Sequence, residues 1–265
     1  MGILNVTPDS FYDGGRYQQV DAAIQHALKM IQEGADIIDI GGESTRPGAT
    51  PLSASEECDR VIPIIEALRK ISDIPLSIDS RHTAVIEAAL AAGANIVNSI
   101  DALADAAQCA LVARFQVPVC LMHMQGTPSN MQQAPHYKDV LQEVYDFFRW
   151  RIAICEKAGI LRENIWIDPG FGFGKTLAHN LHLLANLSFF KTLHCPILVG
   201  LSRKSLWGEI LNAPPQERLY GSLTGATLAA LQGAAIIRTH DVAATQDMRA
   251  VINAVRRIDT HVCAS

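Results

Sequence analysis

The sequence has little of what marks membrane, secreted or nucleic-acid-binding proteins. Among its 265 residues, no apolar run approaches the ~20 residues that a membrane helix needs. Residues 1–9 lack a basic start and include a proline and an acid, unlike a signal peptide. The net charge is -5 and the lysines and arginines are scattered, so no basic stripe exists to bind nucleic acid. We therefore expect a cytoplasmic protein with no membrane or nucleic-acid partner.

Paired cysteines are also missing. No Cys-x-x-Cys pair and no histidine cluster at metal-ligand spacing is present. Most cysteines lie in apolar stretches, which favours small buried side chains over metal ligands or disulfides. There is no Ser-His-Asp or reactive-cysteine pattern, so nothing indicates covalent nucleophilic catalysis. The six cysteines are Cys58, Cys109, Cys120, Cys155, Cys195 and Cys263.

What the sequence has instead is a regular alternation of two kinds of segment. Short runs rich in Ile, Val and Leu alternate with longer segments whose apolar residues recur every three or four positions, which is typical of βα units. Eight such units without a linker predict a closed (β/α)8 TIM barrel in a single domain spanning residues 1–265. An open doubly wound sheet is the alternative. The predicted strands are 3–6, 36–40, 75–79, 95–98, 118–122, 164–168, 196–200 and 235–239.

Polar residues stand at the ends of these predicted strands. In (β/α)8 barrels the chemistry lies at the C-terminal ends of the strands, where the loops gather. One such residue is usually a helix cap or a turn residue, but a nearly complete set indicates a site. In chain order the ends carry Asn5, Asp39, Asp79, Asn98, Met122 with His123, Asp168, residues 202–205, and Arg238 with His240.

Four of these residues suit a flat heterocycle with alternating N–H and C=O edges, because together they bring acceptors, an amide and a cationic donor to one pocket. A structural Asp–Lys ion pair is the alternative reading of the same residues. The four are Asp79, Asn98, Asp168 and Lys204.

An anion is expected beside this pocket. Arg238 and His240 lie two residues apart on the last strand and point the same way, near the position where barrels often bind phosphate. Lys204 and Ser205 open a predicted helix whose free N–H groups favour an anion, although Ser205 also fits a plain cap.

Three loops are rich in glycine. Residues 7–16 and 41–51 combine Gly and Pro with hydrogen-bonding side chains, which is typical of lids or substrate-binding loops. Residues 168–175 look like a phosphate loop but lack Walker A spacing. We interpret them as a loop that presents Phe173.

Together these segments resemble the dihydropteroate synthase family nearly end to end. The similarity rests on NVTPDSF at 5–11, DIGGESTRPG at 39–48, DPGFGFGK at 168–175, SRKS at 202–205 and RTH at 238–240. The resemblance implies a transferase of folate biosynthesis that condenses 6-hydroxymethyl-7,8-dihydropterin pyrophosphate with p-aminobenzoate, giving 7,8-dihydropteroate and pyrophosphate. It also implies Mg²⁺, a homodimer and a sulfonamide target.

The resemblance further implies roles for individual residues. Asp79, Asn98, Asp168 and Lys204 would hold the pterin edge, with Met122 and Phe173 on its faces. Arg238 would pack on the pterin and, with His240, bind phosphate oxygens, while Asn5 would help to hold the metal and the pyrophosphate. Thr239 is expected to contact substrate as well. The aminobenzoate site would be shaped by Phe11, Thr45, Arg46, Pro47 and Ser205.

Two departures and two alternatives accompany the resemblance. The family usually carries a short N-terminal segment before its first strand, whereas the first predicted strand here lies directly at the start of the given sequence. Ser99 stands where the family commonly has Asp, directly after the pterin-binding Asn98, and we expect its side chain to point away from the pocket. A methyltetrahydrofolate-corrinoid methyltransferase is the enzyme alternative, but that family lacks the SRKS and STRPG segments. A pterin-binding protein without catalysis is the second alternative. It is disfavoured because the sequence keeps Asn5, Arg46, Lys204, Arg238 and His240.

Overall fold

All eight predicted strands form, each within two residues of its expected ends. The structure, a computed structural model, describes residues 1–6, 16–43 and 52–262. Runs of Ile, Val and Leu suit these strands because their side chains are buried on both faces of a parallel sheet. The strands are β1 (Gly2–Asn5), β2 (Ile38–Gly41), β3 (Leu76–Asp79), β4 (Ile96–Ser99), β5 (Val119–Met122), β6 (Ile165–Asp168), β7 (Leu198–Gly200) and β8 (Ile236–Arg238).

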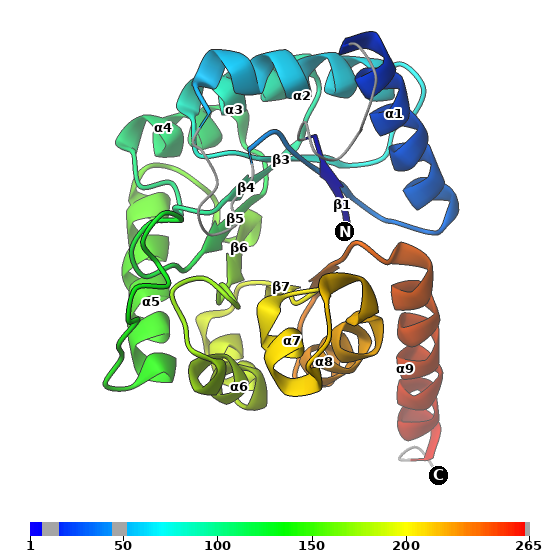
Figure 1. The fold of residues 1–265 in the computed structure, drawn as a ribbon. Helices are drawn as coiled ribbons and strands as arrows, with labels where there is room; N and C mark the ends of the chain where they lie inside the picture. The colour runs from blue at the N-terminus through cyan, green and yellow to red at the C-terminus, as the bar shows by residue number, and fades with distance from the viewer. Residues whose placement is uncertain (7–15, 44–51, 263–265) are drawn as a thin grey trace.

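The strands form a ring of parallel neighbours (Figure 1). Strands β1 to β6 make one sheet in sequence order, and β7 pairs with β8 in a second. Parallel bridges join the two sheets at both seams, Gly2 with Thr239 and Ile167 with Ile197. The backbone amide of Ile3 donates to the Thr239 carbonyl at 3.0 Å across the first seam. The predicted (β/α)8 barrel is confirmed, and the open sheet is not.

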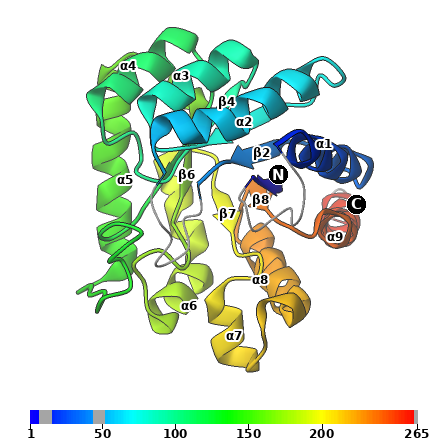
Figure 2. The same ribbon diagram turned by 45° about the horizontal axis from the view of Figure 1, so that its top comes forward.

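Helices surround the ring in both views (Figures 1 and 2). They follow the strands in alternation, except that two helices, α7 and α8, lie between β7 and β8. The helices are α1 (Arg16–Gln32), α2 (Ala54–Arg69), α3 (Thr83–Ala92), α4 (Ala106–Phe115), α5 (Val140–Lys157), α6 (Leu177–Ala185), α7 (Ser205–Leu211), α8 (Leu219–Leu231) and α9 (Val242–Val262). Within the described residues, no helix is both long and apolar enough to cross a membrane.

Local sequence signals set the ends of helix α2. The Ser53 hydroxyl oxygen accepts from the backbone N–H of Glu56, and the Glu56 carboxylate accepts from the backbone N–H of Ser53. This pair of hydrogen bonds is a capping box, which starts the helix. Pro63 lies inside this helix, which is nevertheless continuous from Ala54 to Arg69.

The core fills the space between the strands and the helices. Leu4, Ile40 and Ile78 are fully buried at successive strands, and the large side chains of Phe148 and Phe190 pack on the helical side. Cysteines 109, 120, 155 and 195 are buried, and Cys58 is half-buried. The prediction of small buried side chains is confirmed for these, whereas Cys263 lies outside the described residues.

Candidate active site

Strand register brings the predicted site residues together at one end of the ring. The Cα of Asp79 on β3 pairs with Gly41 of β2 on one side and with Asn98 of β4 on the other. Met122 at the end of β5 pairs with Asp168 at the end of β6. Neighbouring parallel strands thus present their last side chains at the same level. We call this C-terminal end of the ring of strands the barrel mouth.

Arg238 is the centre of a charge cluster at the barrel mouth. Its Nε lies 2.5 Å from Asp39 Oδ2, and its second guanidinium nitrogen lies 2.7 Å from Asp79 Oδ2. The Asn98 side-chain amide donates to the same Asp39 oxygen at 3.1 Å. Asp39 therefore orients both Arg238 and Asn98, a role that its strand-end position signalled but that the sequence did not specify.

Burial sets the proton affinities of this cluster. Burial raises the pKa of Asp79 to about 7, against the opposing effect of Arg238. Burial also raises the pKa of Asp168, and Lys204 opposes this shift. Burial alone would lower the pKa of Arg238, but the charges of Asp39 and Asp79 outweigh it and raise that pKa. The guanidinium therefore stays charged and holds the two carboxylates in place.

Lys204 stands on the other side of the mouth. Its ammonium donates to the Phe171 carbonyl and lies 4.5 Å from the centre of the Phe173 ring. Burial lowers the pKa of Lys204 to about 8, with Asp168 opposing the shift. Asp168 is oriented by the backbone amide of Gly170, which donates to its Oδ1 at 2.8 Å. A cation, a carboxylate and an aromatic face are thus held together for a ligand.

Serine 202 supports the histidine that follows β8. The Ser202 Oγ accepts the backbone N–H of His240 at 3.1 Å and lies 2.9 Å from His240 Nδ1. Together these two contacts fix the position of the His240 imidazole.

The Thr239 side chain contacts the residues at the start of α9. Its Oγ1 accepts from the backbone amide of Asp241 at 3.1 Å and from the Thr245 hydroxyl at 3.1 Å. These contacts anchor the start of α9. A contact between Thr239 and substrate stays a prediction.

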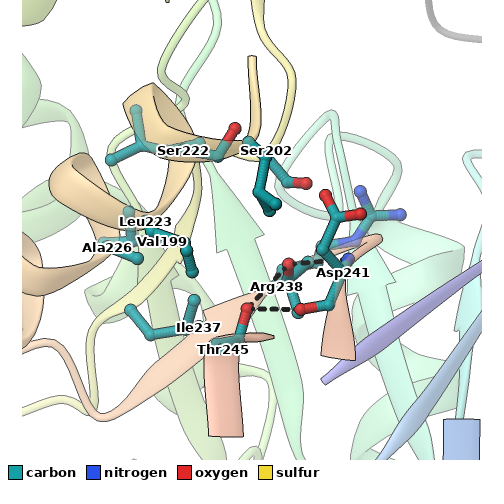
Figure 3. Close-up of a pocket in the computed structure, with 12 residues that line it drawn as sticks. Val199, Ser202, Ser222, Leu223, Ala226, Ile237, Arg238, Asp241 and Thr245 are labelled. Atoms are coloured by element: carbon teal, nitrogen blue, oxygen red, sulfur yellow. Dashed lines mark hydrogen bonds between the residues drawn. The ribbon is translucent and has the colours of Figure 1, made fainter. Parts of the chain in front are cut away.

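The small cavity in Figure 3 lies behind Arg238, between β7, β8 and α8. It is lined mainly by apolar side chains, including Val199, Leu223, Ala226 and Ile237. Its volume of about 10 Å³ is the size of a single water. A bicyclic ligand does not fit there. The polar strand-end residues converge at the barrel mouth, which is therefore the candidate site.

Comparisons with known proteins agree with this geometry. The family model described as "Pterin binding enzyme" matches residues 1–240. The chain belongs to the pterin-binding enzyme family. It is 51% identical to dihydropteroate synthase of Escherichia coli strain K12 over 254 residues, which cover 96% of this chain and 90% of that protein.

Solved structures of this pterin-binding family superpose closely on the chain. Yersinia pestis dihydropteroate synthase in a sulfonamide drug complex matches with a TM-score of 0.92 and 50% identity, covering 97% of this chain and 93% of that one. The Xanthomonas albilineans enzyme in complex with 7,8-dihydropteroate matches with a TM-score of 0.88 and 46% identity, covering 96% and 92%. The likeness spans the whole barrel in each case.

Three further predicted residues of this pterin-binding enzyme lie at the end of β1, at the end of β5 and at the start of α7. Met122 is buried at the end of β5, and Asn5 is half-buried at the end of β1. Ser205 is exposed in the first turn of α7, so the predicted helix start is confirmed. Four predicted residues, Phe11, Thr45, Arg46 and Pro47, lie outside the described residues.

Ser99 turns away from the pocket, as expected. Its hydroxyl donates to Asp101 Oδ1 at 2.7 Å and accepts the backbone amide of Leu103 at 2.8 Å, which fixes the turn after β4. We expect Ser99→Asp to lower stability, because it places a second carboxylate beside Asp101, but to change pterin affinity less than about 3-fold. Calorimetric titration of a pterin, with Ser99→Ala as the comparison, checks this. A larger loss of affinity in Ser99→Asp alone would contradict it.

A buried carboxyl group lies behind Asp79. Glu57 of α2 is fully buried; its Oε2 accepts the Ser80 hydroxyl at 3.0 Å, and its Oε1 has no hydrogen-bond partner among the described residues. Burial raises the pKa of Glu57 from 4.5 to about 7, and the Ser80 contact opposes the shift. The protonated form is therefore the one that the fold accommodates.

This proton makes stability depend on pH. Because the folded pKa is the higher one, the contribution of Glu57 is complete below about pH 4.5 and is lost as pH rises to about 7, a change of about 3 kcal/mol. Glu57→Gln carries no titrating proton, so its free energy of unfolding should fall less than that of the unmodified protein between pH 5 and pH 8. Urea unfolding at both pH values measures the difference. Parallel pH profiles for the two proteins would disprove the assignment.

Proposed function

We propose that this chain catalyses the condensation of 6-hydroxymethyl-7,8-dihydropterin pyrophosphate with p-aminobenzoate to 7,8-dihydropteroate and pyrophosphate. Membership of the pterin-binding family and about half identity to dihydropteroate synthase over nearly the full chain support this activity. The observation that carries it is the clustering of Asp79, Asn98, Asp168 and Lys204 at one barrel mouth. Related enzymes bind 7,8-dihydropteroate and a sulfonamide drug.

The pterin edge is assigned to the carboxylates, the amide and the lysine. Asp79 and Asp168 accept N–H groups of the heterocycle, Asn98 offers both a donor and an acceptor, and Lys204 donates to a ring acceptor. Met122 and Phe173 line the ring faces, and the Arg238 guanidinium packs on the pterin. Arg238 and His240 take the phosphate oxygens. Ser205, with Phe11, Thr45, Arg46 and Pro47, shapes the aminobenzoate site.

Magnesium is proposed as the ion that accompanies the pyrophosphate. Mg²⁺ is commonly held by substrate phosphates, waters and only one or two protein oxygens. Asn5 fits this donor set, because it ends β1 at the mouth and carries an amide oxygen. Among the described residues, no group of three or more His, Cys, Asp or Glu is arranged to hold a metal. When bound, the ion supplies positive charge next to the departing pyrophosphate.

The reaction breaks the bond between the pterin methylene and the pyrophosphate oxygen. Both bonding electrons leave with the pyrophosphate, whose charge Arg238 and His240 stabilise, while the electron-rich pterin stabilises the methylene cation. The nitrogen of p-aminobenzoate then attacks the methylene and releases one proton. No covalent enzyme intermediate is required, so positioning and electrostatics carry the rate.

The direct test is pyrophosphate release by the purified protein with Mg²⁺, the pterin pyrophosphate and p-aminobenzoate, each omitted in turn. Release that needs all three, together with formation of 7,8-dihydropteroate, is the expected result. Sulfonamides, as aminobenzoate analogues, should compete with p-aminobenzoate. Pterin binding without release would replace synthesis with the binding-protein or methyltransferase alternative.

We also propose a homodimer in the cytoplasm. Helix α9 carries Val251, Val255 and Ile258 at spacings of four and three residues, all strongly exposed on one face. Leu228 and Leu231 are exposed on α8, which packs against α9. Contiguous apolar surface of this kind is typical of a subunit interface. The free cysteines among the described residues support the cytoplasm.

The proposed dimer predicts the molar mass of the protein in solution. Light scattering after gel filtration should give twice the mass of one chain, and Val255→Glu combined with Ile258→Glu should give a single chain, because both charges would be buried at the interface. Ile71→Glu, at an exposed apolar residue beyond the end of α2, is the matched control and should stay dimeric. A dimer that survives the double substitution would place the interface elsewhere.

A further inference from the structure

A buried lysine next to the pterin site has no part in the proposed chemistry. Lys175 is 3% exposed, and its Nζ lies 3.0 Å from the carbonyl oxygens of Gly170 and Phe173. The same nitrogen lies 3.0 Å from His123 Nδ1 and 3.3 Å from the His123 carbonyl oxygen. An ammonium group is costly to bury unless its donors are satisfied, so these contacts define where the side chain must lie.

The contacts of Lys175 connect two parts of the barrel mouth. Gly170 and Phe173 belong to the glycine-rich segment 168–175, whereas His123 directly follows β5. Gly170 has a φ of +70°, and a Cβ there would lie 1.9 Å from the His123 carbonyl oxygen. The segment therefore runs directly against the end of β5, with the lysine ammonium closing the junction.

The glycine-rich segment in turn positions the groups assigned to the pterin. The Gly170 amide orients Asp168, the Phe171 carbonyl accepts from Lys204, and the Phe173 ring lies 4.5 Å from the Lys204 nitrogen. Lys175 binds the carbonyls of Gly170 and Phe173, on either side of Phe171. The backbone path between these two carbonyls thus decides the relative placement of Asp168, Lys204 and the aromatic face.

We propose that Lys175 is a positioning residue of the pterin site, which ties the segment 168–175 to His123 and so holds Asp168 and Lys204 at the spacing that a pterin requires. This inference rests on the proposed function. The role is separate from binding the aminobenzoate, because the contacts of Lys175 within the described part of the chain, to Gly170, Phe173 and His123, lie on the pterin side of the mouth.

The charges around Lys175 agree with this arrangement. Burial lowers the pKa of Lys175 to about 7, with Asp168 opposing the shift and Lys204 adding to it. Burial and the neighbouring Lys175 lower the pKa of His123 to about 2, so the imidazole is neutral and its Nδ1 accepts from the ammonium. His123 also packs edge-on against the Phe147 ring at 4.9 Å, which fixes the plane of the acceptor.

Other contacts should keep the segment folded when the ammonium is removed. The Tyr137 hydroxyl donates to the Gly174 carbonyl at 2.8 Å. The Gly172 amide donates to Asn180 Oδ1 at 2.8 Å, and Asn180 Nδ2 donates to the Thr176 carbonyl at 2.8 Å. Lys175→Met, which keeps the length of the side chain but lacks donors, is therefore a suitable test.

The experiment measures pterin affinity and aminobenzoate KM separately. In calorimetry with Mg²⁺ and the pterin pyrophosphate, Lys175→Met should bind at least about 10-fold more weakly than the unmodified protein. Its KM for p-aminobenzoate at saturating pterin should change less than about 3-fold. Lys29→Met, at a surface lysine of α1, is the control and should match the unmodified protein in both. Folded Lys175→Met with pterin affinity within about 2-fold of this control would overturn the proposal.

A second variant decides the question if Lys175→Met does not fold. Lys175→Gln keeps one N–H donor group for the carbonyls and should bind the pterin at least about 3-fold more weakly, with the aminobenzoate KM again unchanged. A positioning role would be contradicted if pterin affinity and aminobenzoate KM were weakened equally, or if neither changed. If the unmodified protein and Lys29→Met themselves neither bind the pterin nor release pyrophosphate, the proposed function fails instead.

Discussion

Lys204→Ala is expected to lower kcat/KM by at least about 10²-fold. The substitution removes a cation that is held between the Phe171 carbonyl and the Phe173 ring, opposite Asp168. Without it, a ring acceptor of the pterin loses a charged donor, and the buried Asp168 loses its opposing charge. Steady-state kinetics with each substrate varied in turn measures the loss.

Lys138→Ala, at an exposed lysine, is the control for the loss of one positive charge from the chain and should leave kcat/KM unchanged. The pH profile gives a second check. Because the pKa of Lys204 lies at about 8, pterin affinity should fall as pH rises through that value, and Lys204→Ala should lack this step. Near-normal activity of Lys204→Ala would remove the lysine from the site.

Arg238→Met is expected to cost both activity and about 3–5 kcal/mol of stability. The guanidinium is the shared partner of Asp39 and Asp79, and Asp39 is fully buried. Its removal leaves two carboxylates close together without the cation that holds them. Denaturant unfolding should show the loss of stability, and pyrophosphate release should be abolished, because the proposed phosphate and pterin contacts go with the same side chain.

A second substitution separates the two effects of losing Arg238. Asp39→Asn in the Arg238→Met background removes one of the stranded charges and should recover part of the lost stability. Activity should not return, since the guanidinium is still absent. A double variant no more stable than Arg238→Met would show that repulsion between Asp39 and Asp79 is not the source of the loss.

Much of the barrel could be predicted from the sequence because its signals are local. A strand such as β3 can be predicted from a run of four or five residues. The residue that ends a strand also begins the following loop, so Asp79, Asn98 and Asp168 could be placed at one edge of the sheet. The capping box of Ser53 and Glu56 is equally local. Pro63 is an exception, since a proline inside a helix normally interrupts it, whereas α2 is continuous from Ala54 to Arg69.

The partners within the site could not be predicted in the same way. Arg238 contacts Asp39 and Asp79 from 199 and 159 residues away along the chain, and no local pattern specifies that pairing. Lys175 is the last residue of the loop predicted over 168–175, and no local pattern indicates that its side chain contacts His123. His123 stood at a strand end in the sequence, yet its tautomer and its neutral state depend on burial that only the fold supplies.

The seam between the first and last strands has a consequence for synthesis of the chain. The Met1 amino group donates to the Ile237 carbonyl across 236 residues, and Arg238 neutralises acids that emerged much earlier. At the usual synthesis rate of about 5–20 residues per second, Arg238 is added roughly 10–40 seconds after Asp39. During that interval the nascent chain has an open sheet edge, and Asp39 and Asp79 lack their counter-ion Arg238. The proposed pterin site is therefore complete only once β8 has left the exit tunnel.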